Sequence, residues 1–169
     1  GGMLAYGIPS FRLEKSVIEA EIEVLKAMGI EFKCGIKVGK DISLDDLRNE
    51  GYEAFYVAIG AQGSRKLNIP GEDNAMVESG IDFLRKVNKT ENPNLISGDV
   101  VVVGGGNVAI DVARAALRSG AQKVHLCSLE QEGEMLASPE EVLEAKEEEI
   151  LLHCGWGPKE ILEAVSYTH

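Results

Sequence analysis

Three consecutive glycines, Gly104–Gly106, stand between the apolar run Val100–Val103 and a stretch in which apolar residues recur at helical spacing. Gly104, Gly106 and Ala109 satisfy the G-x-G-x-x-G/A spacing. The first glycine turns the chain tightly, the second lets a pyrophosphate approach the backbone, and the small third residue lets helix and strand pack closely. The N–H groups at the helix start attract phosphate without a basic side chain. The stretch therefore predicts a dinucleotide-binding turn, with a purely structural turn as the alternative.

An acidic residue follows the next predicted strand. Glu130 lies 24 residues past Gly106, close to the spacing of about 20 at which a carboxylate hydrogen-bonds the adenosine ribose. The sequence has no Lys or Arg between Val124 and Glu144. A 2′-phosphate there would face an uncompensated carboxylate, and each like-charge contact costs about 4 kcal/mol at an effective dielectric near 20. This favours NADH over NADPH, with Glu132 or a backbone group as the alternative ribose contact.

Composition excludes several classes of partner. The formal net charge of −11 repels nucleic acid and anionic lipid, and the chain has no apolar run long enough to cross a membrane. Cys34, Cys127 and Cys154 are widely spaced and odd in number, which favours reduced, buried thiols in a cytoplasmic protein over disulfides or a metal site. We therefore expect a soluble cytoplasmic protein that binds neither nucleic acid nor membranes.

Apolar periodicity and turn residues predict alternating strands and helices. Ser138, Pro139 and Glu141 form a capping-box pattern, and the Glu-rich stretch 140–149 reads as the solvated face of the helix that follows. Polar segments over 64–74 and 88–99 read as connections. The predicted helices cover 15–28, 43–48, 78–87, 107–118 and the residues from 139, and the predicted strands cover 30–33, 54–59, 100–103 and 123–127. This order predicts an α/β fold, with a Rossmann-like parallel sheet.

Four stretches together resemble successive landmarks of the glutamate synthase small-subunit family of FAD- and NAD(P)-dependent oxidoreductases, which includes the flavin module of dihydropyrimidine dehydrogenase. They are GGMLAYGIPSFRLEK (1–15), YVAIGAQGSRKLNIPGED (56–73), VVVVGGGNVAIDVARAALRSGA (100–121) and GWGPKEIL (155–162). The resemblance implies an NAD(P) domain inserted into an FAD domain. Residues 1–74 would be part of the FAD domain, and residues 75–169 a C-terminally truncated NAD(P)-binding domain. The first FAD glycine fingerprint, the closing FAD segment and an iron-sulfur domain have no counterpart here, so the resemblance implies an internal fragment.

The resemblance also assigns residues to cofactors. It places Met3, Arg12, Val38 and Ala58–Gly60 against FAD, with Arg12 on the pyrophosphate or the flavin edge; a plain surface arginine is the alternative. It places Gly105, Gly106, Asn107 and Val108, with the pair Leu129–Glu130, against the nicotinamide nucleotide. Members that use NADPH carry a basic pair at the last two positions, so Leu129 and Glu130 depart from that pattern.

The implied reaction is hydride transfer from NADH to FAD, with electrons passed on to a redox partner such as a glutamate synthase large subunit or an iron-sulfur protein. The cofactors carry this chemistry, so we assign no catalytic acid, base or nucleophile. His125, His153 and Cys127 read as packed or surface residues. The alternative is an isolated NAD-binding module without flavin or turnover. A single-domain dehydrogenase is disfavoured because no Tyr-x-x-x-Lys pair follows the glycines.

Overall fold

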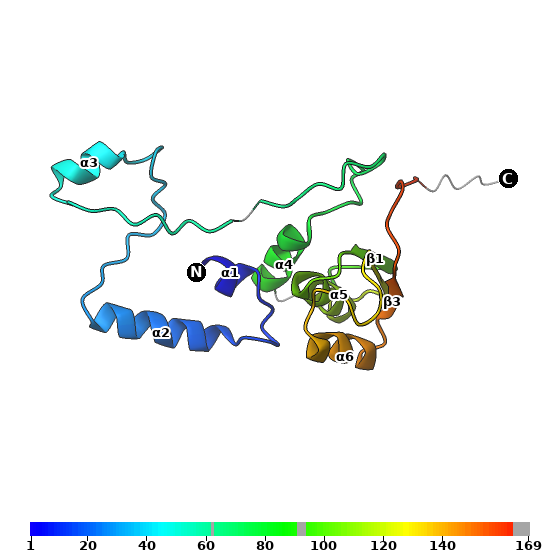
Figure 1. Cartoon of the computed structure of the whole chain (residues 1–169). Coiled ribbons are helices and arrows are strands. Elements are labelled where there is room, and N and C mark those ends of the chain that lie inside the picture. The colour runs from blue at the N-terminus through cyan, green and yellow to red at the C-terminus, as the bar shows by residue number, and fades with distance from the viewer. Residues whose placement is uncertain (62, 91–93, 164–169) are drawn as a thin grey trace. The chain divides into compact units, whose positions relative to one another are not determined.

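The structure is a computed structural model that describes residues 1–61, 63–90 and 94–163 (Figure 1). It divides into two compact units. Unit 1 comprises Gly1–Glu14 with Gln62–His169, apart from the residues left undescribed, and unit 2 comprises Lys15–Ala61. This division follows packing and differs from the expected boundary at residue 74, because the first 14 residues pack with the later part of the chain. The assignment of 1–74 to an FAD domain stays a prediction.

Unit 1 is built on a parallel three-stranded sheet in the order β1-β2-β3. Its register pairs Val102 with Leu126, and Leu126 with Leu152. Helix α5 packs on β1 and β2, and against α4 and α6. The α/β fold with a parallel sheet is therefore confirmed. The bounds are α1 Gly2–Tyr6, α4 Gly80–Lys89, β1 Asp99–Val103, α5 Asn107–Arg118, β2 Lys123–Ser128, α6 Pro139–Glu147 and β3 Leu151–Cys154.

The core of unit 1 lies between the sheet and α5. Alternate residues of β2 are buried, as a strand with one covered face requires. Helix α5 contributes small side chains such as Ala113 and Ala116, which let it approach the strands closely. The most deeply buried large side chains include Leu84, Ile110, Val124 and Leu126. The valine run and the helical pattern after the glycines thus fold as the sequence predicts.

Unit 2 contains α2 (Lys15–Ala27) and α3 (Leu44–Asn49). Gly29 follows α2 with a φ of +89°, as expected of a glycine that ends a helix. The strands predicted over 30–33 and 54–59 are wrong: both segments are irregular, and Tyr56, Val57 and Ile59 are 95%, 76% and 81% exposed. A strand exists only where a neighbour accepts and donates its backbone hydrogen bonds. The described part of unit 2 offers these segments no such neighbour.

Helix α6 corrects two further expectations. Ser138 accepts a hydrogen bond from the N–H of Glu141 at 3.4 Å, which is the first half of a capping box. The reciprocal half is missing, because the Glu141 carboxylate turns to Arg12 instead. The Glu-rich face is also only partly solvated, since Glu141 is 7% exposed. In the described residues, no helix combines the length and the apolar character that a bilayer crossing needs.

Candidate nucleotide-binding site

The glycine turn joins the end of β1 to the start of α5, at the carboxyl edge of the sheet. The N–H of Gly104 donates to the carbonyl of Cys127 at 2.9 Å, which ties the turn to β2. The φ of Gly104 is +145°, and a Cβ there would lie 3.2 Å from that of Ala109. The turn therefore needs a glycine at its first position for both backbone conformation and space, as the motif predicts.

The start of α5 is open. Gly106 is the residue before the helix, and no side chain in the described residues caps it. A Cβ placed on Gly106 would meet nothing within 4 Å, so the backbone faces free space. The first turn of a helix has N–H groups without intrahelical acceptors, and the helix dipole is positive there. These features fit a pyrophosphate. Asn107 and Val108 begin the helix, and both are exposed.

Glu130 lies beside the glycine turn. A Cβ on Gly105 would overlap the Glu130 carboxylate and would lie 3.1 Å from the Cβ of Ser128. The absence of a side chain at Gly105 therefore lets the acidic residue approach the turn. Leu129, its neighbour, is 76% exposed. The alternative residue, Glu132, forms an ion pair with Lys146 of α6.

Main-chain hydrogen bonds brace the loops around the turn, and sequence reasoning missed most of them. The carbonyl of Gly105 accepts from the N–H of Ala137 at 2.9 Å. Asn107 Oδ1 accepts from the N–H of Ser138 at 2.9 Å, so this side chain holds the start of α6. The carbonyl of Glu130 accepts from the N–H of Gly155 at 2.9 Å. No sequence pattern indicates these links, because the donor in each is a main-chain N–H.

The residues expected at FAD are divided between the two units. Met3 lies half-buried in α1 and Arg12 lies just before unit 2 begins, both in unit 1. Val38, Ala58 and Gly60 belong to unit 2, where all three are exposed. The Arg12 guanidinium forms ion pairs with Asp111 and Glu141. The side chain expected to meet the flavin or its phosphates is therefore already engaged by two carboxylates.

The sheet also brings together two histidines. His125 Nδ1 lies 2.9 Å from His153 Nε2, and the two rings stack with centroids 5.2 Å apart. The described ranges contain no group of side chains suited to hold a metal ion. Cys127 is half-buried, and burial raises the pKa of its thiol. Cys34 is exposed, which corrects the expectation that all three thiols are buried.

The chain is similar to several known proteins. The chain is 42% identical to the NADP(+)-dependent formate dehydrogenase subunit beta of Moorella thermoacetica, over 90% of this chain and 22% of that protein. It is 37% identical to the glutamate synthase [NADPH] small chain of Escherichia coli, over 88% and 33%. FprA of Mycobacterium tuberculosis, solved in complex with NADPH, superposes with a TM-score of 0.67 at 25% identity, over 86% of this chain and 38% of FprA.

The chain thus spans between a fifth and two fifths of the length of these relatives. The profile of one family, pyridine nucleotide-disulphide oxidoreductase, matches residues 16–155, which include the glycine turn, Glu130 and all three strands. Most of the chain is covered by that match. The chain belongs to the pyridine nucleotide-disulphide oxidoreductase family.

Proposed function

We propose that this chain binds the nicotinamide dinucleotide of a flavin-linked oxidoreductase, with the pyrophosphate at the glycine turn and a preference for NADH. The observation that carries the proposal is the uncapped start of α5, which faces open space at Gly106. A dinucleotide placed there receives N–H groups from the helix start and meets no side chain of the turn. The bound nucleotide supplies a hydride, which is two electrons with one proton.

The preference for NADH rests on Glu130. Its carboxylate lies beside Gly105, near the end of β2, where the adenosine ribose is expected. It can accept hydrogen bonds from ribose hydroxyls, whereas a 2′-phosphate would be repelled by about 4 kcal/mol at close range before salt screening. Lys146 does not offset this charge, because it pairs with Glu132. The names of several relatives specify NADP(H), so a preference for NADH would distinguish this chain from those proteins.

FAD as the hydride acceptor is proposed from the family resemblance alone. Arg12 is engaged by two carboxylates, and the other candidates, Met3, Val38, Ala58 and Gly60, are divided between the two units. The two relatives described above are subunits of larger enzymes, according to their names. We therefore propose that electrons leave through a redox partner, such as a glutamate synthase large subunit or an iron-sulfur protein, when the chain is part of a complete flavoprotein.

Titration of the purified chain with NADH and NADPH tests the nucleotide proposal. We expect NADH to bind at least tenfold more tightly, since each tenfold step requires only about 1.4 kcal/mol. Replacing Leu129 and Glu130 with arginine should reverse the preference, and Glu147→Gln, which removes one charge from an exposed residue of α6, is the control that leaves it unchanged. If the double variant has the same ratio of NADH to NADPH affinity as the parent chain, Glu130 is not part of the site. No binding of either nucleotide would reject the site itself.

The second candidate is a nucleotide-binding module without flavin. The pairing of Arg12 with Asp111 and Glu141, which occupies the one cation expected at FAD, favours it. Flavin absorbance of the purified chain separates the two functions: a yellow protein supports the flavin-linked function, and a colourless protein that binds NADH supports the module.

A further inference from the structure

The segment that leads towards unit 2 is fastened to unit 1 along its length. Pro9 is fully buried, and the side-chain amide of Asn88 in α4 donates to the carbonyls of Tyr6 and Ile8 at 2.8 and 3.3 Å. Helix α1 lies against α4. The first residues of the chain therefore do not trail freely, and they are held before they reach α5.

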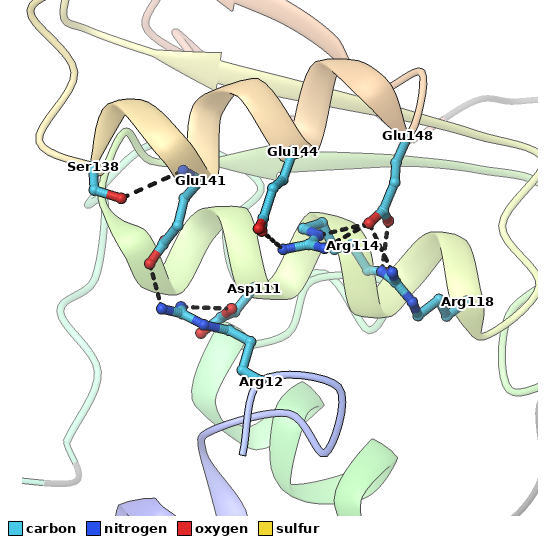
Figure 2. A network of polar contacts seen from close by, with 8 residues as sticks. All are labelled: Arg12, Asp111, Arg114, Arg118, Ser138, Glu141, Glu144 and Glu148. Atoms are coloured by element: carbon cyan, nitrogen blue, oxygen red, sulfur yellow. Dashed lines mark hydrogen bonds and ion pairs between the residues drawn. The ribbon is translucent and has the colours of Figure 1, made fainter. Parts of the chain in front are cut away.

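Arg12 then joins α5 to α6. Its Nη1 pairs with Asp111 of α5 at 3.0 Å, and its Nη2 pairs with Glu141 of α6 (Figure 2). Asp111 and Glu141 are only 6% and 7% exposed. A guanidinium can serve two carboxylates because its donors form a planar fork. Burial raises the pKa of Asp111, and the hydrogen bond and charge of Arg12 offset only part of that rise.

Phe11 contacts the next turns of the same helix. Its ring centre lies 4.8 Å from the guanidinium carbon of Arg114 and 4.1 Å from that of Arg118. Both distances are within the range of a cation–π contact. Adjacent residues of the segment thus bind successive turns of α5, on the face that also meets α6.

The two helices meet through matching rows of charge. On α5 the row is spaced i, i+3, i+7, which places its members on one face. The row on α6 has the same spacing, and Figure 2 shows its carboxylates directed towards α5. Arg114 pairs with Glu144 and Glu148, and Arg118 pairs with Glu148. The rows are Asp111, Arg114 and Arg118 on α5, and Glu141 and Glu144 on α6 with Glu148 at its C-cap. Arg12 supplies the cation that the first turn of this interface lacks.

We propose that Phe11 and Arg12 form a clamp that fixes the point on unit 1 from which the chain leaves towards unit 2, and that Arg12 is a positioning residue instead of a flavin contact. The clamp lies on the helix whose first residues carry the nucleotide site. Any effect of the clamp on turnover rests on the proposed function, because only a flavin-linked enzyme needs its two nucleotide-binding parts kept at a fixed relative position. The clamp itself does not depend on that function.

Amide hydrogen exchange on the full chain tests the clamp. Arg12→Met should accelerate exchange of the amides in residues 6–13 at least tenfold, and the double variant Asp111→Asn with Glu141→Gln should do the same. Arg12→Lys should restore part of the protection, because a lysine keeps the charge but cannot span both carboxylates. Arg48→Met is the control, since it removes an exposed pair with Asp45 and a cation–π contact with Phe55, both within unit 2. Unchanged exchange in folded Arg12→Met would reject the clamp.

A second readout follows the unit boundary. The chain has a single tryptophan, Trp156 in unit 1, and an exposed thiol, Cys34 in unit 2. Energy transfer from Trp156 to a dye on Cys34, with the other two cysteines replaced by serine, measures the spread of distances between the units. Release of the clamp should widen that spread. A spread that is identical in the parent chain and in folded Arg12→Met would contradict the positioning role.

The flavin alternative gives a different pattern. If Arg12 touched flavin, Arg12→Met would weaken binding of added FAD more than tenfold, while the Asp111 and Glu141 variant would not. That result would overturn the proposal. Should Arg12→Met fail to fold, Phe11→Leu tests the same clamp through its other residue, with a rise in exchange of a few fold expected and no rise counting against the clamp. Failure of the parent chain to bind NADH would refute the proposed function and leave the exchange result standing.

Discussion

Two apolar runs of this chain, each ended by a glycine, fold in different ways. Val100–Val103 forms β1 and carries the glycine turn, whereas 54–59, before Gly60, forms no strand. The difference lies in their surroundings. The valine run pairs with β2 and packs under α5, while Ile59 is 81% exposed. An apolar run bounded by a glycine therefore predicts a strand only where the chain also supplies a neighbour and a cover.

The strongest test of this comparison deletes apolar side chains in each unit. Leu126→Ala should lower the free energy of unfolding by about 2–5 kcal/mol, because Leu126 is fully buried and its removal leaves a cavity. Ile59→Ala is the matched change in unit 2 and should lower the free energy of unfolding by less than about 0.5 kcal/mol. Urea unfolding followed by circular dichroism measures both. Equal costs would show that the run at 54–59 is buried in solution.

A second test compares the glycines that end the two runs. Gly104→Ala should destabilise unit 1 by about 1–3 kcal/mol and weaken NADH binding at least tenfold, since its φ is +145° and its Cβ would press on Ala109. Gly60→Ala faces open space at a φ of +69°, so only backbone strain of about 1 kcal/mol is expected. Thermal unfolding and NADH titration give the two readouts. If Gly104→Ala binds NADH as tightly as the parent chain does, the glycine turn is not part of the nucleotide site.

The smallest expected effect concerns pH. Burial would raise the pKa of Glu148, but hydrogen bonds from Arg118 and Arg114 outweigh it and hold that pKa below its ordinary value of 4.5. The folded state therefore binds this proton less readily than the unfolded state. The ion pairs of Glu148 with Arg114 and Arg118 therefore stabilise unit 1 above about pH 4.5. This stabilisation is lost as the pH falls through the pKa of Glu148 in the folded state.

Glu148→Gln should accordingly flatten the rise of the urea midpoint with pH in the range below about pH 4.5, with a cost of about 1 kcal/mol or less at neutral pH. Asp46→Asn is the control in unit 2. A hydrogen bond from Ser43 lowers the pKa of Asp46, but this carboxylate is exposed and should contribute less to the slope. A slope that is the same with and without Glu148 would mean that the α5–α6 ion pairs do not control acid stability.

The parts of the fold that the sequence predicted correctly depend on local information. The period of the apolar residues and the glycine spacing are enough to place β1, the turn, α5 and β2, because these neighbours in sequence are also neighbours in space. Glu130 could be placed near the glycine turn for the same reason, since the carboxyl ends of the parallel strands β1 and β2 lie at one edge of the sheet. Whether Glu130 touches the ribose stays a prediction.

Distant partners were beyond this reasoning. Arg12 meets Asp111 and Glu141, which lie far along the chain, so no local pattern around Arg12 indicates either contact. The same pairing explains why Ser138 forms only half of its capping box: the glutamate that would complete it is drawn to an arginine from elsewhere. Long-range electrostatics thus overrode a local rule that the sequence satisfies.

The hydrogen bonds around the nucleotide site come mostly from the main chain. The carbonyls of Gly105 and Glu130 accept from Ala137 and Gly155, so the loops keep their shape whatever side chains they carry. Leu129 and Glu130 can therefore change in charge and size without dismantling the rim on which they stand. If these two positions set the coenzyme preference as proposed, a scaffold of this kind separates the evolution of coenzyme choice from the evolution of stability, and protein engineers can alter both positions at small structural cost.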